Sequence, residues 1–242
     1  AARRAIIRST RDEAGATDDA RQIPGWEAVD HVAAVSTRAL YTLAPAGGRR
    51  GRATLVDFGV KRSLLRALTE RGLEVLVLPH DATASDVAAT SPNLVVLSPG
   101  PGDPSRMASQ IGMTGELARQ AVAGGGPPIL GICLGHQLLA LAAGAETRRL
   151  AVGHHGGNHA VLELEAGRVD IGAHNHEVEV VDGPALAAAG YLVSHRDLND
   201  GTVEGLVHAS GRIASVQFHP EGAPGPIDAA RVFDLAIEGT TG

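Results

Sequence analysis

The feature that most constrains this chain is the stretch Gly-Ile-Cys-Leu-Gly-His-Gln at residues 131–137, which contains the only cysteine among 242 residues. Residues 128–130 before it are typical of a short buried strand, and the apolar residues 138–143 after it are typical of a packed helix. A Gly-x-Cys-x-Gly pattern at such a junction predicts a nucleophile elbow, a sharp turn that exposes one side chain at the strand end. The helix N-terminus lends positive partial charge, which favours a thiolate on Cys133. The alternative is a buried structural cysteine, as most lone cysteines are.

A second stretch supplies the base that a thiol nucleophile needs. A strand-like run at residues 213–218 ends at His219, and Glu221 follows two residues later. Pro220 stiffens the link, so the carboxylate of Glu221 can turn back to the imidazole and fix its tautomer. Cys133 and His219 are far apart in the sequence, and only the fold can bring them together.

Strand-like and helical segments alternate between residues 53 and 130. The predicted strands are 53–57, 73–78, 94–97 and 128–130, and the predicted helices are 61–70, 84–89 and 107–123. Repeated strand-helix units indicate an α/β fold with a parallel sheet and helices on both faces. Ligands of such sheets bind beyond the carboxyl ends of the strands, where both Gly100 and Cys133 are expected.

The chain beyond Ala145 has a different pattern, in which short strand-like runs are separated by turns. The runs are 160–164, 169–173, 178–181, 191–194, 203–207 and 213–218, and a closing helix is predicted at 227–237. These runs favour antiparallel strands that flank or extend the parallel sheet.

Composition narrows the class of protein. Hydrophobic residues make up 44% of the chain and aromatic residues only 2%, so the core is expected to consist of Ala, Val, Leu and Ile. The net charge of −6 provides no basic surface for nucleic acid. A single cysteine cannot form an intrachain disulfide, and no apolar run approaches the roughly 20 residues of a membrane helix. We therefore expect a cytoplasmic protein that binds neither nucleic acid nor membrane.

Together with a glycine-proline loop at residues 98–104, Ser-Pro-Gly-Pro-Gly-Asp-Pro, these motifs resemble the class I, triad-type glutamine amidotransferases. Further stretches resemble the small-subunit family of carbamoyl-phosphate synthases. They are Gly-His-His-Gly-Gly-Asn-His at 153–159, Leu-Asn-Asp-Gly-Thr-Val-Glu-Gly at 198–205 and Ala-Pro-Gly-Pro at 223–226. The resemblance implies a mostly parallel sheet with helices on both faces and an antiparallel extension, preceded by the remnant of an N-terminal domain.

The resemblance also implies roles for individual residues. Cys133 would attack the side-chain amide of glutamine, His219 would transfer the proton and Glu221 would orient His219. The backbone N–H groups of Gly100 and Leu134 would hold the oxyanion. The remaining expected contacts with glutamine come from Gly102, Gln137, Asn175, Glu177 and Val178.

One departure from the family pattern affects that substrate site. The family has Asn-His-Gly-Phe where this chain has Asn175-His176-Glu177-Val178. In the family the backbone of the Gly-Phe pair holds the head group of the substrate. Glu177 adds bulk and negative charge there, so we expect weaker affinity for glutamine.

Histidines gather in two places and raise the question of a metal site. His154, His155 and His159 are close in sequence, and His174 and His176 alternate, which places the latter two on one face of a strand. No cysteine or acidic residue lies at zinc spacing beside them, and the resembled family uses no metal there. We therefore expect no metal, and we expect the loop at 153–159 to serve structure or a partner interface.

The first 50 residues differ from the rest. Pro24-Gly25-Trp26 and the following residues up to Leu43 resemble the end of the N-terminal domain of the small subunit, and residues 44–52 are typical of a linker. The chain begins without methionine, so we expect a fragment or a processed chain. The expected domains are 1–50, the tail of an N-terminal domain with its linker, and 51–242, the amidotransferase domain.

The expected function is the glutaminase component of glutamine-dependent carbamoyl-phosphate synthase. It would hydrolyse glutamine through a cysteinyl thioester and supply ammonia to a large synthetase subunit for arginine and pyrimidine biosynthesis. No cofactor is expected in this chain, because it has no phosphate-binding loop, and ATP and Mg²⁺ would bind the large partner. Two alternatives stay open: the glutaminase of another amidotransferase, of the anthranilate or aminodeoxychorismate synthase type, and a catalytically impaired partner-binding module.

Overall fold

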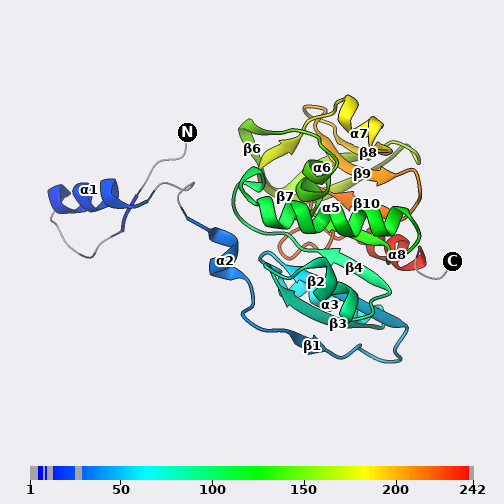
Figure 1. Ribbon diagram of the computed structural model, residues 1–242. Helices are drawn as coiled ribbons and strands as arrows, with labels where there is room; N and C mark the ends of the chain where they lie inside the picture. Colours follow the sequence, from blue (N-terminus) through cyan, green and yellow to red (C-terminus); the bar gives the residue numbers. More distant parts are fainter. Residues whose placement is uncertain (1–4, 8, 10–12, 25–28, 240–242) are drawn as a thin grey trace.

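The computed structural model describes residues 5–7, 9, 13–24 and 29–239 (Figure 1). Within these residues, ten strands form one sheet in the order β1-β3-β2-β4-β5-β10-β9-β7-β6-β8. The strands are β1 (Tyr41–Leu43), β2 (Gly51–Asp57), β3 (Leu73–Pro79), β4 (Leu94–Leu97), β5 (Ile129–Ile132), β6 (Thr147–Glu163), β7 (Arg168–Val180), β8 (Tyr191–Asp197), β9 (Val203–His208) and β10 (Ile213–Val216). The helices are α1 (Glu13–Gln22), α2 (His31–Val35), α3 (Arg62–Glu70), α4 (Ala84–Ala89), α5 (Ala108–Val122), α6 (Leu134–Ala142), α7 (Pro184–Ala188) and α8 (Arg231–Glu238), and η2 (Pro104–Arg106) is a 3-10 turn.

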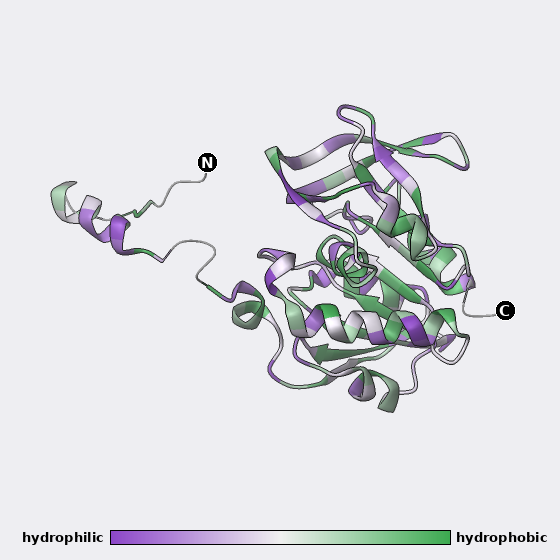
Figure 2. Ribbon diagram, turned by 45° about the horizontal axis from the view of Figure 1, so that its top comes forward, coloured by the Kyte–Doolittle hydropathy of each residue, from purple (hydrophilic) through white to green (hydrophobic). Residues whose placement is uncertain are grey.

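The predicted strand-helix units form the parallel half of the sheet. Strands β3, β2, β4, β5 and β10 all run in the same direction. Alternate residues of β2 enter two separate apolar clusters: Val56 packs in a cluster with α4, α5 and α6, and Leu55 packs in a cluster with α3 and α8. Helices therefore cover both faces, as predicted, and Figure 2 shows the hydrophobic colour gathered along the central strands. This arrangement brings the carboxyl ends of five parallel strands to one edge.

The other half of the sheet is antiparallel and larger than the sequence suggested. Strands β9, β7, β6 and β8 pair in that order, and β8 pairs again with β9, which closes them into a small barrel. Figure 1 shows β6, β7 and β8 beside the parallel half. The α/β class is confirmed, but the expected mostly parallel sheet is wrong: the parallel strands make up only one half. The reason is that β1 and the four strands β6 to β9 all pair antiparallel with their neighbours.

The stretch 153–159, expected to be a loop, lies inside β6. Its histidines pair across to β7, with His154 opposite His176 and His155 opposite Asn175. The ladder is irregular on both sides of these pairs, between Arg149 and His154 and between Gly156 and His159. The glycines of this segment are typical of a loop, but cross-strand pairing with an irregular register holds the segment in the sheet.

The segment before residue 50 is only partly attached to the sheet. Strand β1 pairs antiparallel with β3, so it covers the edge of the parallel half, and Val32 of α2 is buried in the first apolar cluster. Figure 1 shows α1 apart from the sheet. Gly25 and Trp26, part of the expected N-terminal remnant, lie outside the described residues. The linker predicted at residues 44–52 is two residues too long, because β2 begins at Gly51.

Candidate active site

Cys133 lies at the sharp turn between β5 and α6. Its backbone angles are φ 53° and ψ −102°, a region that residues other than glycine rarely adopt. A Cβ on Gly131 would lie 2.6 Å from Leu139 Cδ1, and a Cβ on Gly135 would lie 2.3 Å from the carbonyl oxygen of Leu97. Both flanking glycines are therefore required for close packing, as an elbow demands.

His219 reaches Cys133 because their strands are neighbours. Strand β10 pairs parallel with β5, with Val216 opposite Ile132, and His219 follows β10 as Cys133 follows β5. Backbone hydrogen bonds hold both turns: the Cys133 N–H donates to Val216 O, and the His219 N–H donates to Ala173 O, each at 2.8 Å. Two residues that are far apart in the sequence therefore lie close together, because β5 and β10 are adjacent in the sheet.

The imidazole of His219 lies between the thiol and a carboxylate. Its Nδ1 donates to Glu221 Oε1 at 2.8 Å, which leaves Nε2 for the side of Cys133. Burial lowers the pKa of His219, but hydrogen bonds and charge from Cys133 and Glu221 outweigh burial and raise the pKa to about 10. His219 therefore keeps its proton at neutral pH.

Glu221 is held by a residue that sequence reasoning missed. Lys61 Nζ lies 3.0 Å from Glu221 Oε1 and donates to the carbonyl oxygen of Gly222 at 2.7 Å. Burial raises the pKa of Glu221, but the contacts with His219 and Lys61 outweigh burial and leave the pKa lowered. Lys61 precedes α3, and no local pattern connects it with a turn at the far end of the chain.

The glycine-proline loop follows β4, the strand that pairs with β5. A Cβ on Gly100 would lie 2.2 Å from the carbonyl oxygen of Phe58, so only glycine fits there, and Gly102 has φ +106°. Ser98 Oγ fixes the loop by accepting from the Phe58 N–H and donating to the Pro99 carbonyl, both at 2.8 Å. In the described part of the chain, the N–H groups of Gly100 and Leu134 donate to no other residue. Both remain available for an oxyanion.

The other expected substrate contacts are spread over α6 and β7. Gln137 is buried, and its Nε2 donates to Val178 O at 2.9 Å and to Gln217 Oε1 at 3.0 Å, so it fixes β7 against α6. Asn175 is exposed, and its Oδ1 lies 3.0 Å from His155 Nδ1. The carboxylate of Glu177 is exposed and forms an ion pair with Arg149. Arg149 therefore offsets the negative charge of Glu177 beside the expected position of the substrate head group.

Comparison with known proteins places this geometry in a family. The sequence model of the family described as glutamine amidotransferase class-I matches residues 54–238, about three quarters of the chain. The chain belongs to this family. The amidotransferase motifs identified from the sequence all fall in the matched region.

Two curated relatives are similar to this chain over most of its length. The amidotransferase is 45% identical over 184 residues to the carbamoyl phosphate synthase pyrimidine-specific small chain of Lactiplantibacillus plantarum, covering 76% of this chain and 49% of that relative. It is 45% identical over 205 residues to the carbamoyl phosphate synthase small chain of Bacillus caldolyticus, covering 85% and 54%. The chain thus spans about half the length of the curated relatives it matches.

A solved structure supports the fold. The crystal structure of a protein from Thermoplasma acidophilum, assigned as one subunit of a GMP synthase, matches with a TM-score of 0.66 at 23% identity. The match covers 78% of the amidotransferase and 93% of that chain.

None of the helices among the described residues has both the length and the apolar character that a membrane span requires.

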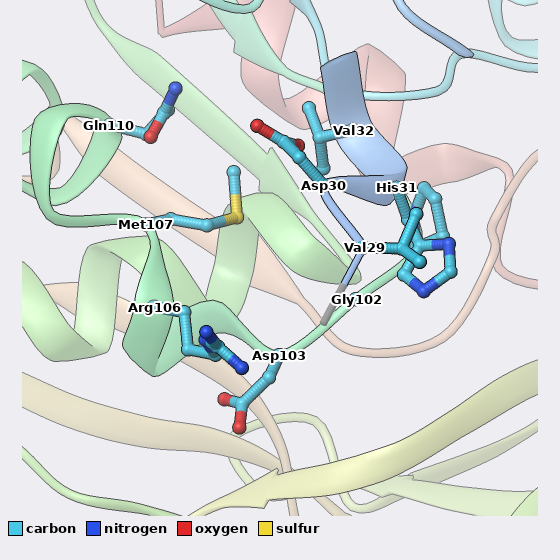
Figure 3. Close-up of a pocket in the computed structure, with 10 residues that line it drawn as sticks. Val29, Asp30, His31, Val32, Gly102, Asp103, Arg106, Met107 and Gln110 are labelled. Carbon is cyan, nitrogen blue, oxygen red and sulfur yellow. The ribbon is translucent and has the colours of Figure 1, made fainter. Parts of the chain in front are cut away.

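A cavity of about 330 Å³ lies on the outer side of the glycine-proline loop. Figure 3 shows Val29, Asp30 and His31 on one side of it and Met107 and Gln110 on the other. Gly102 is the lining residue that the cavity shares with the expected substrate site, and Cys133 and His219 do not line it. The cavity therefore lies beside the candidate active site, at the glycine-proline loop, and does not include the thiol or the imidazole.

Proposed function

We propose that this amidotransferase hydrolyses glutamine to glutamate and ammonia through a thioester on Cys133. The observation that carries the proposal is the elbow at Cys133 together with the hydrogen-bonded pair of His219 and Glu221 on the adjacent strand. A strained, glycine-flanked turn that aims a thiol at a paired imidazole suits nucleophilic catalysis and has no evident structural purpose.

In the first half of the reaction the Cys133 thiolate attacks the amide carbon of the glutamine side chain. The carbonyl oxygen becomes an oxyanion, and the N–H groups of Gly100 and Leu134 are placed to stabilise it. As the tetrahedral intermediate collapses, the C–N bond breaks and protonated His219 donates its proton to the departing ammonia. The product is a thioester between Cys133 and the glutamyl group.

In the second half a water molecule attacks the thioester while neutral His219 accepts its proton. Collapse of the second tetrahedral intermediate breaks the C–S bond and releases glutamate and the Cys133 thiolate, while the proton stays on His219, which restores the starting pair. Glu221, fixed by Lys61, keeps the imidazole in one tautomer through both halves. Gly102, Asn175 and the backbone of residues 177–178 would hold the head group of glutamine.

We further propose that the ammonia is delivered to a large carbamoyl-phosphate synthase subunit. The names of the curated relatives and their identity of about 45% over most of this chain support this partner. ATP and Mg²⁺ would bind that subunit, and the product would serve arginine and pyrimidine biosynthesis. In this arrangement residues 51–242 form the amidotransferase domain, and residues 1–50 are the tail of an N-terminal domain with its linker.

The test is ammonia release from glutamine, measured with and without a large carbamoyl-phosphate synthase subunit, beside Cys133→Ser. We expect release that the substitution abolishes and that the partner increases. Cys133-dependent release that the partner leaves unchanged would favour another amidotransferase. No release from the folded chain at saturating glutamine, with or without the partner, would contradict the catalytic proposal and leave a partner-binding module.

A further inference from the structure

Four ionisable side chains meet inside the small barrel, away from the thiol. His154 comes from β6, His174 and His176 from β7, and Glu204 from β9. All four are buried, with exposed fractions of 6%, 4%, 6% and 0% in that order. The sequence shows no acidic residue at zinc spacing beside these histidines, but the pairing of β9 in the sheet brings Glu204 to them. Glu204 therefore supplies the acidic partner that the histidines lack in the sequence.

The spacing between the side-chain atoms matches a tetrahedral metal site. His154 Nδ1 lies 3.4 Å from Glu204 Oε1, His176 Nε2 lies 3.7 Å from the same oxygen, and His174 Nδ1 lies 3.6 Å from Oε2. His174 Nδ1 and His176 Nε2 are 3.2 Å apart. Four ligands at zinc bond lengths of about 2.0 to 2.1 Å stand about 3.3 to 3.4 Å from one another. One small ion in the middle would reach all four without a large movement.

Hydrogen bonds outside the cluster orient two of the three histidines, His154 and His176, toward its centre. His154 Nε2 donates to Asp200 Oδ2 at 2.9 Å, which leaves the lone pair of Nδ1 facing Glu204. His176 Nδ1 donates to the Val178 carbonyl at 3.0 Å, which leaves the lone pair of Nε2 facing inward. Metal-binding histidines almost always donate their other N–H to a carboxylate or carbonyl in this way.

Polar atoms in the cluster lack partners in the described structure. His154 Nδ1 and Glu204 Oε2 are buried and make no hydrogen bond with any described residue. Burying such atoms unpaired is costly, and a buried carboxylate more so. An ion at the centre would bond His154 Nδ1 and one carboxylate oxygen of Glu204, and its charge would offset Glu204 and the nearby Asp200.

We propose that His154, His174, His176 and Glu204 bind a zinc ion that ties β6, β7 and β9 together. Three imidazoles and one carboxylate in a tetrahedral set are ligands that zinc accepts. Because all four positions are filled by the protein and the set is buried, the site is structural rather than catalytic. It lies next to the turn that carries His219, since His174 directly follows Ala173, whose carbonyl accepts from the His219 N–H. The proposal does not depend on glutamine hydrolysis.

Two other groups of side chains could also bind a zinc ion. His159 and Asp197 can combine with His154 into a second set, but that set has three members and shares His154 with the first. Cys133 and His219 form the other candidate, since a thiol and an imidazole both bind zinc. The test must separate the four-residue cluster from the thiol.

The experiment uses the 242-residue chain purified without a polyhistidine tag. Bound zinc is counted by elemental analysis after dialysis, and zinc affinity is measured by competition with a chelator. Cobalt(II) is then substituted for zinc, because tetrahedral Co²⁺ absorbs in the visible range and a thiolate ligand adds an intense near-ultraviolet band. The variants are Glu204→Gln, His174→Gln, Asp200→Asn and Cys133→Ala. His195→Gln is the matched control, because His195 is a buried histidine outside the cluster.

We expect one zinc per chain, a tetrahedral Co²⁺ spectrum without a thiolate band, and the same binding in Cys133→Ala and His195→Gln. Glu204→Gln and His174→Gln should lower zinc affinity by at least about 100-fold, and Asp200→Asn by about 10- to 100-fold. Asp200 is partly exposed, so its variant tests the proposal even if the buried variants fail to fold. Zinc binding that Asp200→Asn leaves unchanged, or a thiolate band that Cys133→Ala removes, would overturn the proposal, as would a chain that binds no zinc.

Discussion

Cys133 occupies a backbone conformation that costs on the order of 1–3 kcal/mol for a residue other than glycine. The surrounding structure imposes it, through the hydrogen bond to Val216 O and the packing of two glycines. The motif around Cys133 predicted this turn, because its glycines are local. Lys61 could not be found in the same way, since only the folded chain brings it within 3.0 Å of Glu221.

His136, in the same motif, is fully buried and is expected to make the protein sensitive to acid. Its Nδ1 is hydrogen-bonded to Ser215 Oγ at 2.9 Å, and burial, with the charges of His176 and His195, lowers its pKa to about 3. Unfolded histidine binds a proton below its usual pKa of about 6.5, and folded His136 does not. The contribution of neutral His136 to the free energy of unfolding is therefore complete above pH 6.5 and is lost as the pH falls toward 3. Between pH 7 and pH 5 this one group removes about 2 kcal/mol.

The measurement is urea unfolding of the wild type and of His136→Gln at both pH values. The variant should lose about 2 kcal/mol less than the wild type between pH 7 and pH 5, because its side chain does not titrate. Equal losses in the two proteins would show that His136 is not held neutral by the fold.

At the scale of elements, helix α6 packs on β4 through Gly135. A methyl group there would lie 2.3 Å from the backbone oxygen of Leu97, which cannot move away as a flexible side chain can. We expect Gly135→Ala to lower the free energy of unfolding by about 1–3 kcal/mol, the usual cost of overpacking. Gly112 in α5 is the matched control, since a Cβ there meets nothing within 4 Å.

The comparison is by urea or thermal unfolding of both variants. Gly112→Ala should raise stability by up to about 1 kcal/mol, because alanine favours a helix more than glycine does. A Gly135→Ala protein as stable as Gly112→Ala would mean that α6 does not approach β4 as closely as described.

The parallel half of the sheet could be predicted from the sequence, and the barrel could not. The strands and helices of the parallel half follow local periodicity, and they were predicted to within a few residues. The barrel depends on which strand pairs with which, such as His154 with His176, and on the second pairing of β8 with β9. These are long-range contacts, so the barrel and the position of Glu204 inside it were not predictable from spacing.

For the molecule as a whole, the contributions of the N-terminal helices to stability are expected to differ. Val32 of α2 is 3% exposed and packs in the main apolar cluster, whereas the described side chains of α1 are exposed or half-buried. Val32→Ala should therefore cost about 1.5 kcal/mol, from two buried methyl-sized groups. In a chain of this size that lowers Tm by about 3–6 °C.

Deletion of residues 1–24 should change Tm by less than about 2 °C, because none of the described side chains in this segment is fully buried. Differential scanning calorimetry of the two variants checks both values. A deletion that lowers Tm as much as Val32→Ala would show that the segment packs on the rest of the molecule.

Cys133 and His219, the proposed nucleophile and base, follow neighbouring parallel strands, β5 and β10, and such strands lie about 4.8 Å apart. The distance between the two groups is therefore set by the hydrogen-bond ladder of the sheet itself and not by the shape of any long surface loop. The outer loops and the N-terminal segment can therefore vary in sequence while the two proposed catalytic groups keep their spacing. The same backbone ladder that stabilises the fold also fixes the proposed chemistry.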